Sequence, residues 1–191
     1  ENAKTKLLKS PFNYSENAYL YVPKDMPESS NRLFNNHLVS HIYPLIIASK
    51  GRAFILSTSI KSMNEITSLL KDEFERNNIS YPILTQGTGS KTKLLEQFKS
   101  HGNAILIGSL SFWEGVDVRG SNLSLVIIDK LPFQSPGDPI FESKINMLSD
   151  KGINAFMTFQ LPKAIIALKQ GAGRLIRDEM DKGVLMICDQ R

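Results

Sequence analysis

The sequence predicts an α/β domain with a mainly parallel central sheet. Short apolar segments rich in β-branched residues alternate along the chain with amphipathic segments of helical spacing. Several segments are apolar at consecutive positions, as at residues 125–128, which is typical of strands that helices cover on both faces. With 191 residues, of which 41% are hydrophobic, the chain is large enough to bury one substantial core.

Strands and helices are expected to alternate in a regular order. The apolar segments predict strands at residues 18–22, 53–57, 81–85, 104–108, 123–128 and 184–188. Between the first two, apolar residues follow helical spacing from Leu33 to Ile46, and Pro44 is expected to kink that helix. This alternation is the pattern of a layered domain in which helices cover a sheet.

Capping residues mark where further helices begin. Residues 62–65 form a capping-box pattern, and Ser90 is a candidate cap for the next helix. Asp138 followed by a proline predicts the start of another helix. A last long helix is expected to open at Pro162 and to extend to about Arg177.

Composition excludes several classes of protein. Cys188 is the one cysteine, so an internal disulfide is impossible and a reducing, cytoplasmic location is expected. The net charge of +4 permits a nucleic-acid partner without arguing for one. No apolar run is long enough to cross a bilayer, and the first residues lack the apolar core of a signal peptide.

Two motifs look functional but are incomplete. Residues 87–92 lie where a phosphate-binding loop would lie, yet no glycine completes the required frame, so we interpret them as a turn and a helix cap. His37 and His41 have a spacing that suits zinc, but no glutamate or third ligand accompanies them. No metal site is therefore predicted, and the chain lacks its own site for nucleotide phosphates.

Two segments carry more information. The loop after the strand at 104–108 contains hydroxyls, an aromatic pair, two carboxylates and a glycine, and loops after parallel strands face the ligand crevice. The alternative is an aromatic plug on an ordinary turn. Farther on, Arg174 and Arg177 are spaced to emerge on the same side of a helix, and guanidinium forks match phosphate oxygens. The alternative there is a salt-bridged helix end involving Asp178 and Glu179.

These segments resemble the DinG/YoaA branch of the XPD-like superfamily 2 DNA helicases. Residues 111–117 are similar to helicase motif V and residues 170–177 to motif VI, joined by the matching segments 129–133 and 138–139. Residues 56–59 resemble motif IV, residues 85–87 the short motif after it, and residues 10–12 the start of this domain. The matches occur in the right order over essentially the whole chain.

The resemblance implies a RecA-like three-layer fold for residues 1–191, a single second helicase domain of a larger protein. Such proteins hydrolyse ATP with Mg²⁺ between two RecA-like domains and move 5′ to 3′ along single-stranded DNA. The first domain supplies the phosphate loop and in many members an iron–sulfur cluster, so both are expected outside this chain. Family likeness also implies a role in DNA repair.

The resemblance assigns roles to individual residues. It makes Arg174 and Arg177 arginine fingers on the γ-phosphate, with Gln170 positioning them or the attacking water. It places four residues at the nucleotide: Glu114, Gly115, Asp117 and Gly173. It places a larger set on the DNA, namely Ser57, Thr58, Ser59, Gln86, Ser109, Ser111, and Phe112 or Trp113. For the aromatic pair, packing beneath the loop is an equal alternative to stacking on a base.

Two other functions stay open from the sequence. One is a non-hydrolytic module that binds single-stranded nucleic acid without needing the two arginines. The other is a DinG-like domain linked to a nuclease and lacking unwinding activity. A small-molecule α/β enzyme is disfavoured because no nucleophile and base are paired in the sequence.

Overall fold

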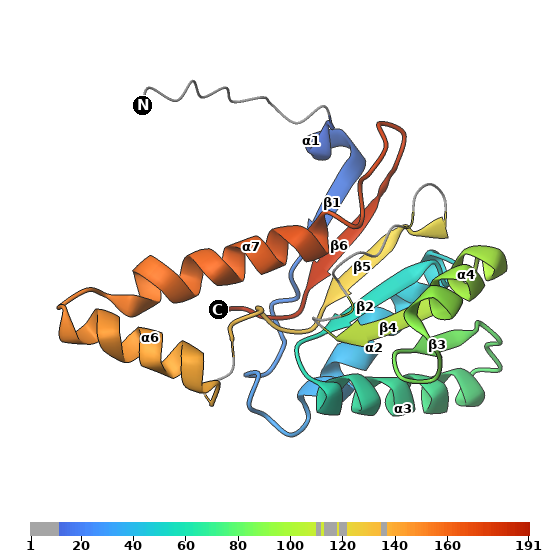
Figure 1. Ribbon diagram of the computed structural model, residues 1–191. Helices are drawn as coiled ribbons and strands as arrows, with labels where there is room; N and C mark the ends of the chain where they lie inside the picture. Colours follow the sequence, from blue (N-terminus) through green and yellow to red (C-terminus); the bar gives the residue numbers. More distant parts are fainter. Residues whose placement is uncertain (1–11, 110–111, 113–117, 119–121, 135–136) are drawn as a thin grey trace.

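A six-stranded parallel sheet forms the centre of the molecule (Figure 1). The computed structural model describes residues 12–109, 112, 118, 122–134 and 137–191. All strand pairs in the sheet are parallel, in the order β1-β6-β5-β2-β4-β3. The strands are β1 (Ala18–Tyr21), β2 (Ala53–Ser57), β3 (Ile83–Thr85), β4 (Ile105–Ser109), β5 (Leu125–Ile128) and β6 (Gly183–Ile187). The predicted α/β class and the parallel sheet are confirmed.

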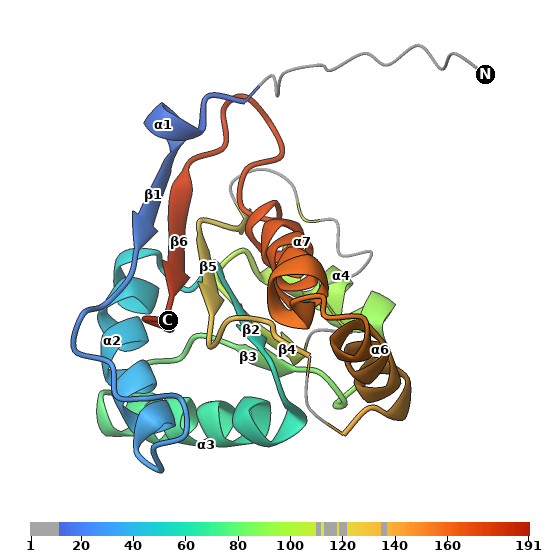
Figure 2. The ribbon, with the colours of Figure 1, turned by 90° about the vertical axis from the view of Figure 1, so that its left-hand side faces the viewer.

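Helices cover both faces of this sheet (Figure 2). The helices are α1 (Tyr14–Asn17), α2 (Phe34–Ala48), α3 (Ile60–Arg76), α4 (Lys91–His101), α6 (Pro139–Asp150), the π-helical η2 (Phe156–Gln160) and α7 (Leu161–Ala172). One core lies between α2, α3 and the strand residues that point toward them, such as Ile55 and Ile107. The second core joins Phe54 and Leu106 of the opposite face to α4 and to the segment after α7. Burial on both faces explains why these strands are apolar at consecutive positions.

Two predicted helix caps are confirmed, and one is wrong. Ser90 caps α4 by accepting a bond from the backbone N–H of Lys93, and Asp138 caps α6. Helix α3, however, begins one turn earlier than the capping box predicted, because Ser59 is its N-cap. Ser62 lies inside the helix, where it is buried and donates its backbone N–H to the Ser59 hydroxyl oxygen over 3.1 Å.

The last helix ends earlier than the sequence predicts. Helix α7 stops at Ala172, and Gly173 is its C-cap. A β-carbon at Gly173 would lie 3.0 Å from the carbonyl oxygen of Lys169, so a larger residue fits poorly there. Leu175 and Ile176 follow at once and are buried, each 3% exposed. The chain thus leaves the helix to bury these two side chains in the second core.

Helices α6, η2 and α7 form an antiparallel helical hairpin that projects beyond the sheet (Figure 1). Proline at the first positions of α6 and α7 is compatible with a helix start, where no backbone donor is needed. In the described part of the chain, none of the helices combines the length and apolarity needed to cross a membrane. The returning helix α7 contacts β5, so the end of the hairpin lies back over the sheet (Figure 1).

The segment that resembles a phosphate loop is the predicted turn and cap. Gly87 has a φ of +96°, a left-handed conformation that favours glycine. The backbone N–H of Thr88 donates to the carbonyl oxygen of Thr85 over 3.2 Å, which closes the turn before Ser90. This interpretation is confirmed.

Candidate functional site

Polar residues collect where the parallel strands end. Because all six strands run the same way, their carboxyl ends lie along one side of the sheet, which we call the carboxyl edge. Strands β2 and β4 end there in the paired residues Ser57 and Ser109. Gln86 follows β3 directly, Asp129 follows β5, and Asp189 lies just beyond β6. The fold therefore brings together residues that are far apart in the sequence.

The three residues expected on DNA from the end of β2 differ in exposure. Ser57 is fully buried, and its hydroxyl has no hydrogen-bond partner among the described residues. Thr58 donates its backbone N–H to Asp129 Oδ1 over 2.9 Å, so this donor is already used. Ser59 is exposed and caps α3. Of the three, Ser59 is the one whose side chain faces solvent at the N-terminus of a long helix.

Gln86 and Ser109, both expected on DNA, bind each other. Gln86 Oε1 accepts hydrogen bonds from the backbone N–H and the hydroxyl of Ser109, over 2.7 and 2.8 Å. This pair joins the ends of β3 and β4. Because Oε1 is taken, the amide Nε2 is the group through which Gln86 can donate to a ligand.

Phe112 lies in the core, which corrects its assignment as a base-stacking residue. The residue is 4% exposed, and its ring contacts Phe54 edge-on at 6.3 Å between centroids. A β-carbon on Gly108 would approach the Phe112 side chain to 2.9 Å, so the ring occupies the space that this glycine leaves. The packing alternative therefore describes Phe112. The other predicted site residues of this loop, Ser111, Trp113, Glu114, Gly115 and Asp117, lie outside the described residues.

The two arginines lie beyond the end of α7, so the argument that placed them on one helical face is wrong. Both are half-buried, and they flank the buried pair Leu175 and Ile176. The backbone N–H of Arg177 donates to Asp181 Oδ2 over 2.9 Å, which fixes the following turn. Burial of the residues between them holds the arginine segment (residues 170–177) on the sheet. Within it, Gln170 and Gly173 are exposed.

Asp129 is the residue at this edge that the sequence argument did not single out. It is fully buried, and burial raises the pKa of its carboxyl to about 6, although bonds from Ser62 and from the backbone of Thr58 and Lys130 oppose the rise. The Ser62 hydroxyl lies 3.0 Å from Asp129 Oδ2 and 3.1 Å from Asn35 Oδ1. A hydroxyl has one hydrogen, so a protonated Asp129 donating to Ser62 would satisfy both contacts.

A second unpredicted pair lies at the end of β6. Arg191 donates from Nε and a terminal nitrogen to the two carboxylate oxygens of Asp189, over 2.9 and 2.6 Å. Asp189 also accepts the backbone N–H of Leu131 over 2.9 Å. Burial would raise the pKa of Asp189, but the bonds from Arg191 and Leu131 outweigh it and hold that pKa below its ordinary value. The pair ties the end of β6 to the segment that follows β5.

Neither the cysteine nor the histidines form a metal site in the described part of the chain. Cys188 is buried, and burial raises the pKa of its thiol far above the ordinary range, so it stays protonated as a core residue. His41 lies 3.2 Å from Asp25, a surface contact. No group of three metal-ligating side chains occurs among the residues that the structure describes.

Comparison with known proteins decides the family. The helicase C-terminal domain family matches residues 42–191. The chain belongs to this family. Among its relatives, the ATP-dependent DNA helicase YoaA of Escherichia coli is 48% identical over 191 residues, which cover 100% of the chain and 29% of YoaA. The 3′-5′ exonuclease DinG of Bacillus subtilis is 35% identical, over 98% of the chain and 20% of that protein.

Solved structures confirm the fold of this helicase C-terminal domain. A structure of an XPD helicase matches with a TM-score of 0.67 at 19% identity, covering 90% of the chain and 31% of the helicase chain. Xpd4 of S. tokodaii gives a TM-score of 0.64 at 17% identity, covering 91% and 34%. The RecA-like fold that the resemblance implied is thereby confirmed. The chain spans less than a third of the length of YoaA.

Proposed function

We propose that this helicase C-terminal domain is the second motor domain of an ATP-dependent DNA helicase that moves 5′ to 3′ on single-stranded DNA. Residues 1–191 form this one domain, and a first RecA-like domain lies elsewhere in the full-length protein. The names of the relatives support this proposal: YoaA is an ATP-dependent DNA helicase, and a 36% identical Mycobacterium tuberculosis relative is an ATP-dependent helicase named DinG.

The arginine segment is the observation that carries the proposal. Arg174 and Arg177 are held beside the second core by Leu175 and Ile176, in a chain that lacks a phosphate loop of its own. Two guanidinium groups carried on a backbone segment held in this way suit the γ-phosphate of a nucleotide bound mainly by a neighbouring domain. Arginine fingers supplied to such a site raise the rate by about 10³–10⁵. Gln170 and Gly173 are exposed beside them and would contact the same nucleotide.

Motif V completes the nucleotide side of the proposal. By resemblance, Glu114, Gly115 and Asp117 contact the nucleotide or couple it to DNA. By the same resemblance, the Mg²⁺ that accompanies ATP lies in the site shared with the first domain. Any iron–sulfur cluster likewise belongs to the remaining part of the protein.

The carboxyl edge is the proposed DNA track. Ser59, at the N-terminus of α3, and the Nε2 group of Gln86 can donate to phosphate oxygens. Ser111 and Trp113 stay predictions of the resemblance. Phosphate contacts hold a strand without reading its sequence, which is what translocation requires. Movement follows if closure on ATP and opening after hydrolysis shift the two domains along the strand.

One comparison favours a second candidate. The B. subtilis relative is named a 3′-5′ exonuclease, so a domain that serves a nuclease without unwinding is a specific alternative. Both candidates use ATP in the same way at the arginine segment. They differ in whether the full-length protein separates the strands of a duplex. An unwinding assay on a forked duplex with the full-length protein separates them.

The test of the proposed function is ATP hydrolysis stimulated by single-stranded DNA. In the full-length protein, Arg174→Ala should lower kcat by about 10³-fold or more while leaving DNA affinity within about twofold. Arg76→Ala is the matched control, because Arg76 is an exposed arginine on α3 that pairs with Glu73. The 191-residue domain alone should hydrolyse no ATP. Normal turnover by Arg174→Ala, or robust turnover by the domain alone, would refute the shared-site proposal.

A further inference from the structure

Two stacked phenylalanines join the segment before the helical hairpin to its returning helix. Phe133, in the segment after β5, and Phe156, the first residue of η2, have ring centroids 5.7 Å apart and an angle of 29° between the rings. Phe133 is half-buried, whereas Phe156 is 46% exposed. Phe156 is thus supported by an aromatic neighbour and still presents much of its surface to solvent.

A fixed cation lies at the Phe133 end of this aromatic pair. The guanidinium carbon of Arg191 is 5.9 Å from the centre of the Phe133 ring. The Arg191 side chain is 59% exposed, and its two bonds to the nearly buried Asp189 fix its orientation. Two-point pairing with a carboxylate fixes the plane of the guanidinium and leaves its remaining N–H groups as donors.

Further positive charge lies on the inner side of the hairpin. Lys163 donates to Gln134 Oε1 over 2.7 Å, beside Phe133, and its ammonium lies 5.5 Å from the centres of two hairpin rings. Lys144 lies 5.0 Å from the centre of one of these rings, that of Phe159. Asp138, which accepts from the same Gln134 side chain, also caps α6.

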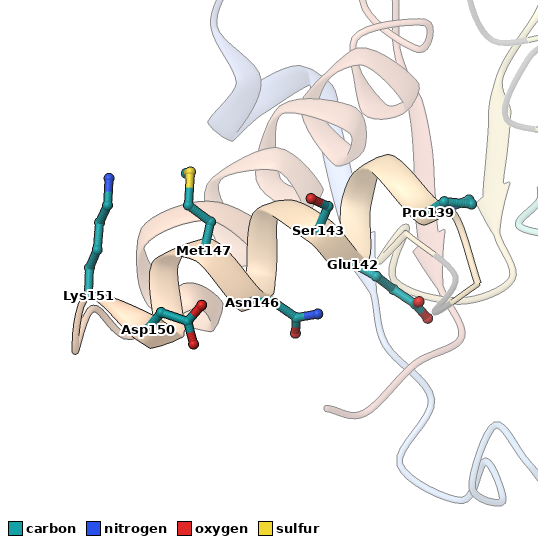
Figure 3. Close-up of a pocket in the computed structure, with 7 residues that line it drawn as sticks. All are labelled: Pro139, Glu142, Ser143, Asn146, Met147, Asp150 and Lys151. Atoms are coloured by element: carbon teal, nitrogen blue, oxygen red, sulfur yellow. The ribbon is translucent and has the colours of Figure 1, made fainter.

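The outer face of α6 differs in charge. A shallow groove of about 630 Å³ there is lined by side chains of α6 and the residue after it, with two carboxylates, Glu142 and Asp150, against one ammonium, Lys151 (Figure 3). Lys144 and Lys163 do not line this groove. A polyanion is therefore attracted to the aromatic side of the hairpin rather than to this outer face.

The aromatic pair continues the carboxyl edge. Phe133 follows β5 and Arg191 follows β6, and Asp189 bonds both Arg191 and the backbone of Leu131. Strands β3 and β6 are four places apart in the sheet, which is about 19 Å at the usual strand spacing. A single strand that contacts Gln86, which follows β3, needs to extend at least that distance, a few nucleotides, to reach the residues beyond β6.

We propose that Phe156, supported by Phe133, which in turn contacts Arg191, is a platform on which a base of the single-stranded DNA stacks. Arg191 binds the phosphate next to that base. This inference rests on the proposed function, because it names where the same strand leaves the carboxyl edge. Every base has a π-face, so a stacking platform between cations holds a strand without selecting its sequence.

The test compares variants of the full-length protein by fluorescence anisotropy with an oligo-dT strand. Phe156→Ala should weaken binding about tenfold, whereas Phe156→Trp should bind as well as the wild type. The slope of log affinity against log salt concentration should be unchanged in Phe156→Ala. In Arg191→Gln it should fall by about one, because one phosphate contact is lost. Ile166→Ala, which alters another exposed apolar residue of the hairpin, is the matched control and should have no effect.

Abasic strands give a second readout. Removing bases from the strand should weaken its binding to the wild type. It should weaken binding to Phe156→Ala much less, because this variant has already lost the stacking contact. Unchanged DNA affinity of Phe156→Ala would overturn the platform. If that variant also lost the ATP hydrolysis measured without DNA, the Phe156 ring would instead be a contact for another part of the protein. Failure of the wild type to bind any single strand would instead overturn the proposed function.

Discussion

The arginine segment and the carboxyl edge are built in opposite ways. At the carboxyl edge, Gln86 bonds Ser109, and Thr58 bonds Asp129, so several polar groups are already satisfied within the domain. The arginine segment leaves its helix, buries Leu175 and Ile176 in the second core, and exposes Gln170 and Gly173. The carboxyl edge is thus organised by hydrogen bonds between strand ends and the arginine segment by apolar packing, and in the proposed function the nucleotide at that segment is shared with a neighbouring domain.

The largest expected effect tests whether the two regions act on different ligands. In the full-length protein, Arg177→Ala should lower ATP hydrolysis about 10³-fold, because it removes charge stabilisation in the transition state. Its affinity for single-stranded DNA should stay within about twofold of the wild type. Steady-state hydrolysis at saturating DNA, combined with anisotropy, measures both quantities.

The converse change is the control for that comparison. Gln86→Ala removes a donor at the carboxyl edge and the bonds to Ser109, so DNA affinity should fall about fivefold. Hydrolysis at saturating DNA should be unchanged. If both variants lost hydrolysis and DNA binding together, the division between the two regions would be wrong.

The buried carboxyl at the edge should make stability depend on pH. The pKa of Asp129 is raised from 3.8 to about 6 in the folded state, so the folded domain binds more protons than the unfolded chain between these values. The contribution of Asp129 is therefore present below about pH 4 and is lost as the pH rises through about 6. The loss is about 3 kcal/mol, to be measured by urea unfolding from pH 4 to 7.5.

Asp129→Asn isolates this effect from other titrating groups. The amide keeps an acceptor for the backbone of Thr58 and can donate to the Ser62 hydroxyl, but it carries no titrating proton. The stability of this variant relative to the wild type should rise by about 3 kcal/mol between pH 4 and pH 7. Parallel pH profiles would contradict the raised pKa.

A smaller effect is expected where motif V meets the sheet. Gly108→Ala places a β-carbon 2.9 Å from the Phe112 side chain, and overpacking of this kind typically destabilises by about 1–3 kcal/mol. Thermal unfolding of Gly108→Ala and of the double variant with Phe112→Leu measures it. The leucine at position 112 should recover part of the lost stability. If Gly108→Ala alone is as stable as the wild type, the Phe112 ring moves aside without cost and the overpacking argument is wrong.

The smallest effect separates folding from ligand binding at one residue. Ser59→Ala should destabilise the domain by about 1 kcal/mol, because α3 loses its N-cap. Ser59→Asp keeps a capping acceptor and should retain stability, yet its negative charge should weaken DNA binding by the full-length protein. Unaltered DNA binding in Ser59→Asp would remove Ser59 from the track.

Elements made by local patterns could be predicted from the sequence. Strand β2 was predicted at its observed bounds because five consecutive apolar or small residues are buried on both faces. The caps at Ser90 and Asp138 depend on residues two or three positions away. Such short-range interactions are visible in the sequence, and the order of the motifs identified the family.

Long-range contacts explain what the sequence did not predict. Asp129 bonds Ser62 across 67 positions, and that contact also places Ser62 inside a helix instead of at its cap. Leu175 and Ile176 continue a helical spacing, but tertiary packing draws them out of the helix into the core. Phe112 is buried because its ring packs edge-on against Phe54 of β2, 58 positions earlier. None of these outcomes follows from the local sequence.

The continuity of η2 and α7 has a mechanical consequence. Residues 156–172 are helical throughout, a rod of roughly 25 Å at about 1.5 Å per residue. One end carries the stacked ring of Phe156, and the other ends at Gly173, next to Arg174. A tilt of about three degrees at the ring would swing the far end by roughly one ångström over that length. In the proposed motor, pulling on a base stacked at Phe156 would therefore move Arg174 relative to the bound nucleotide, so this rod would couple the DNA site to the ATP site.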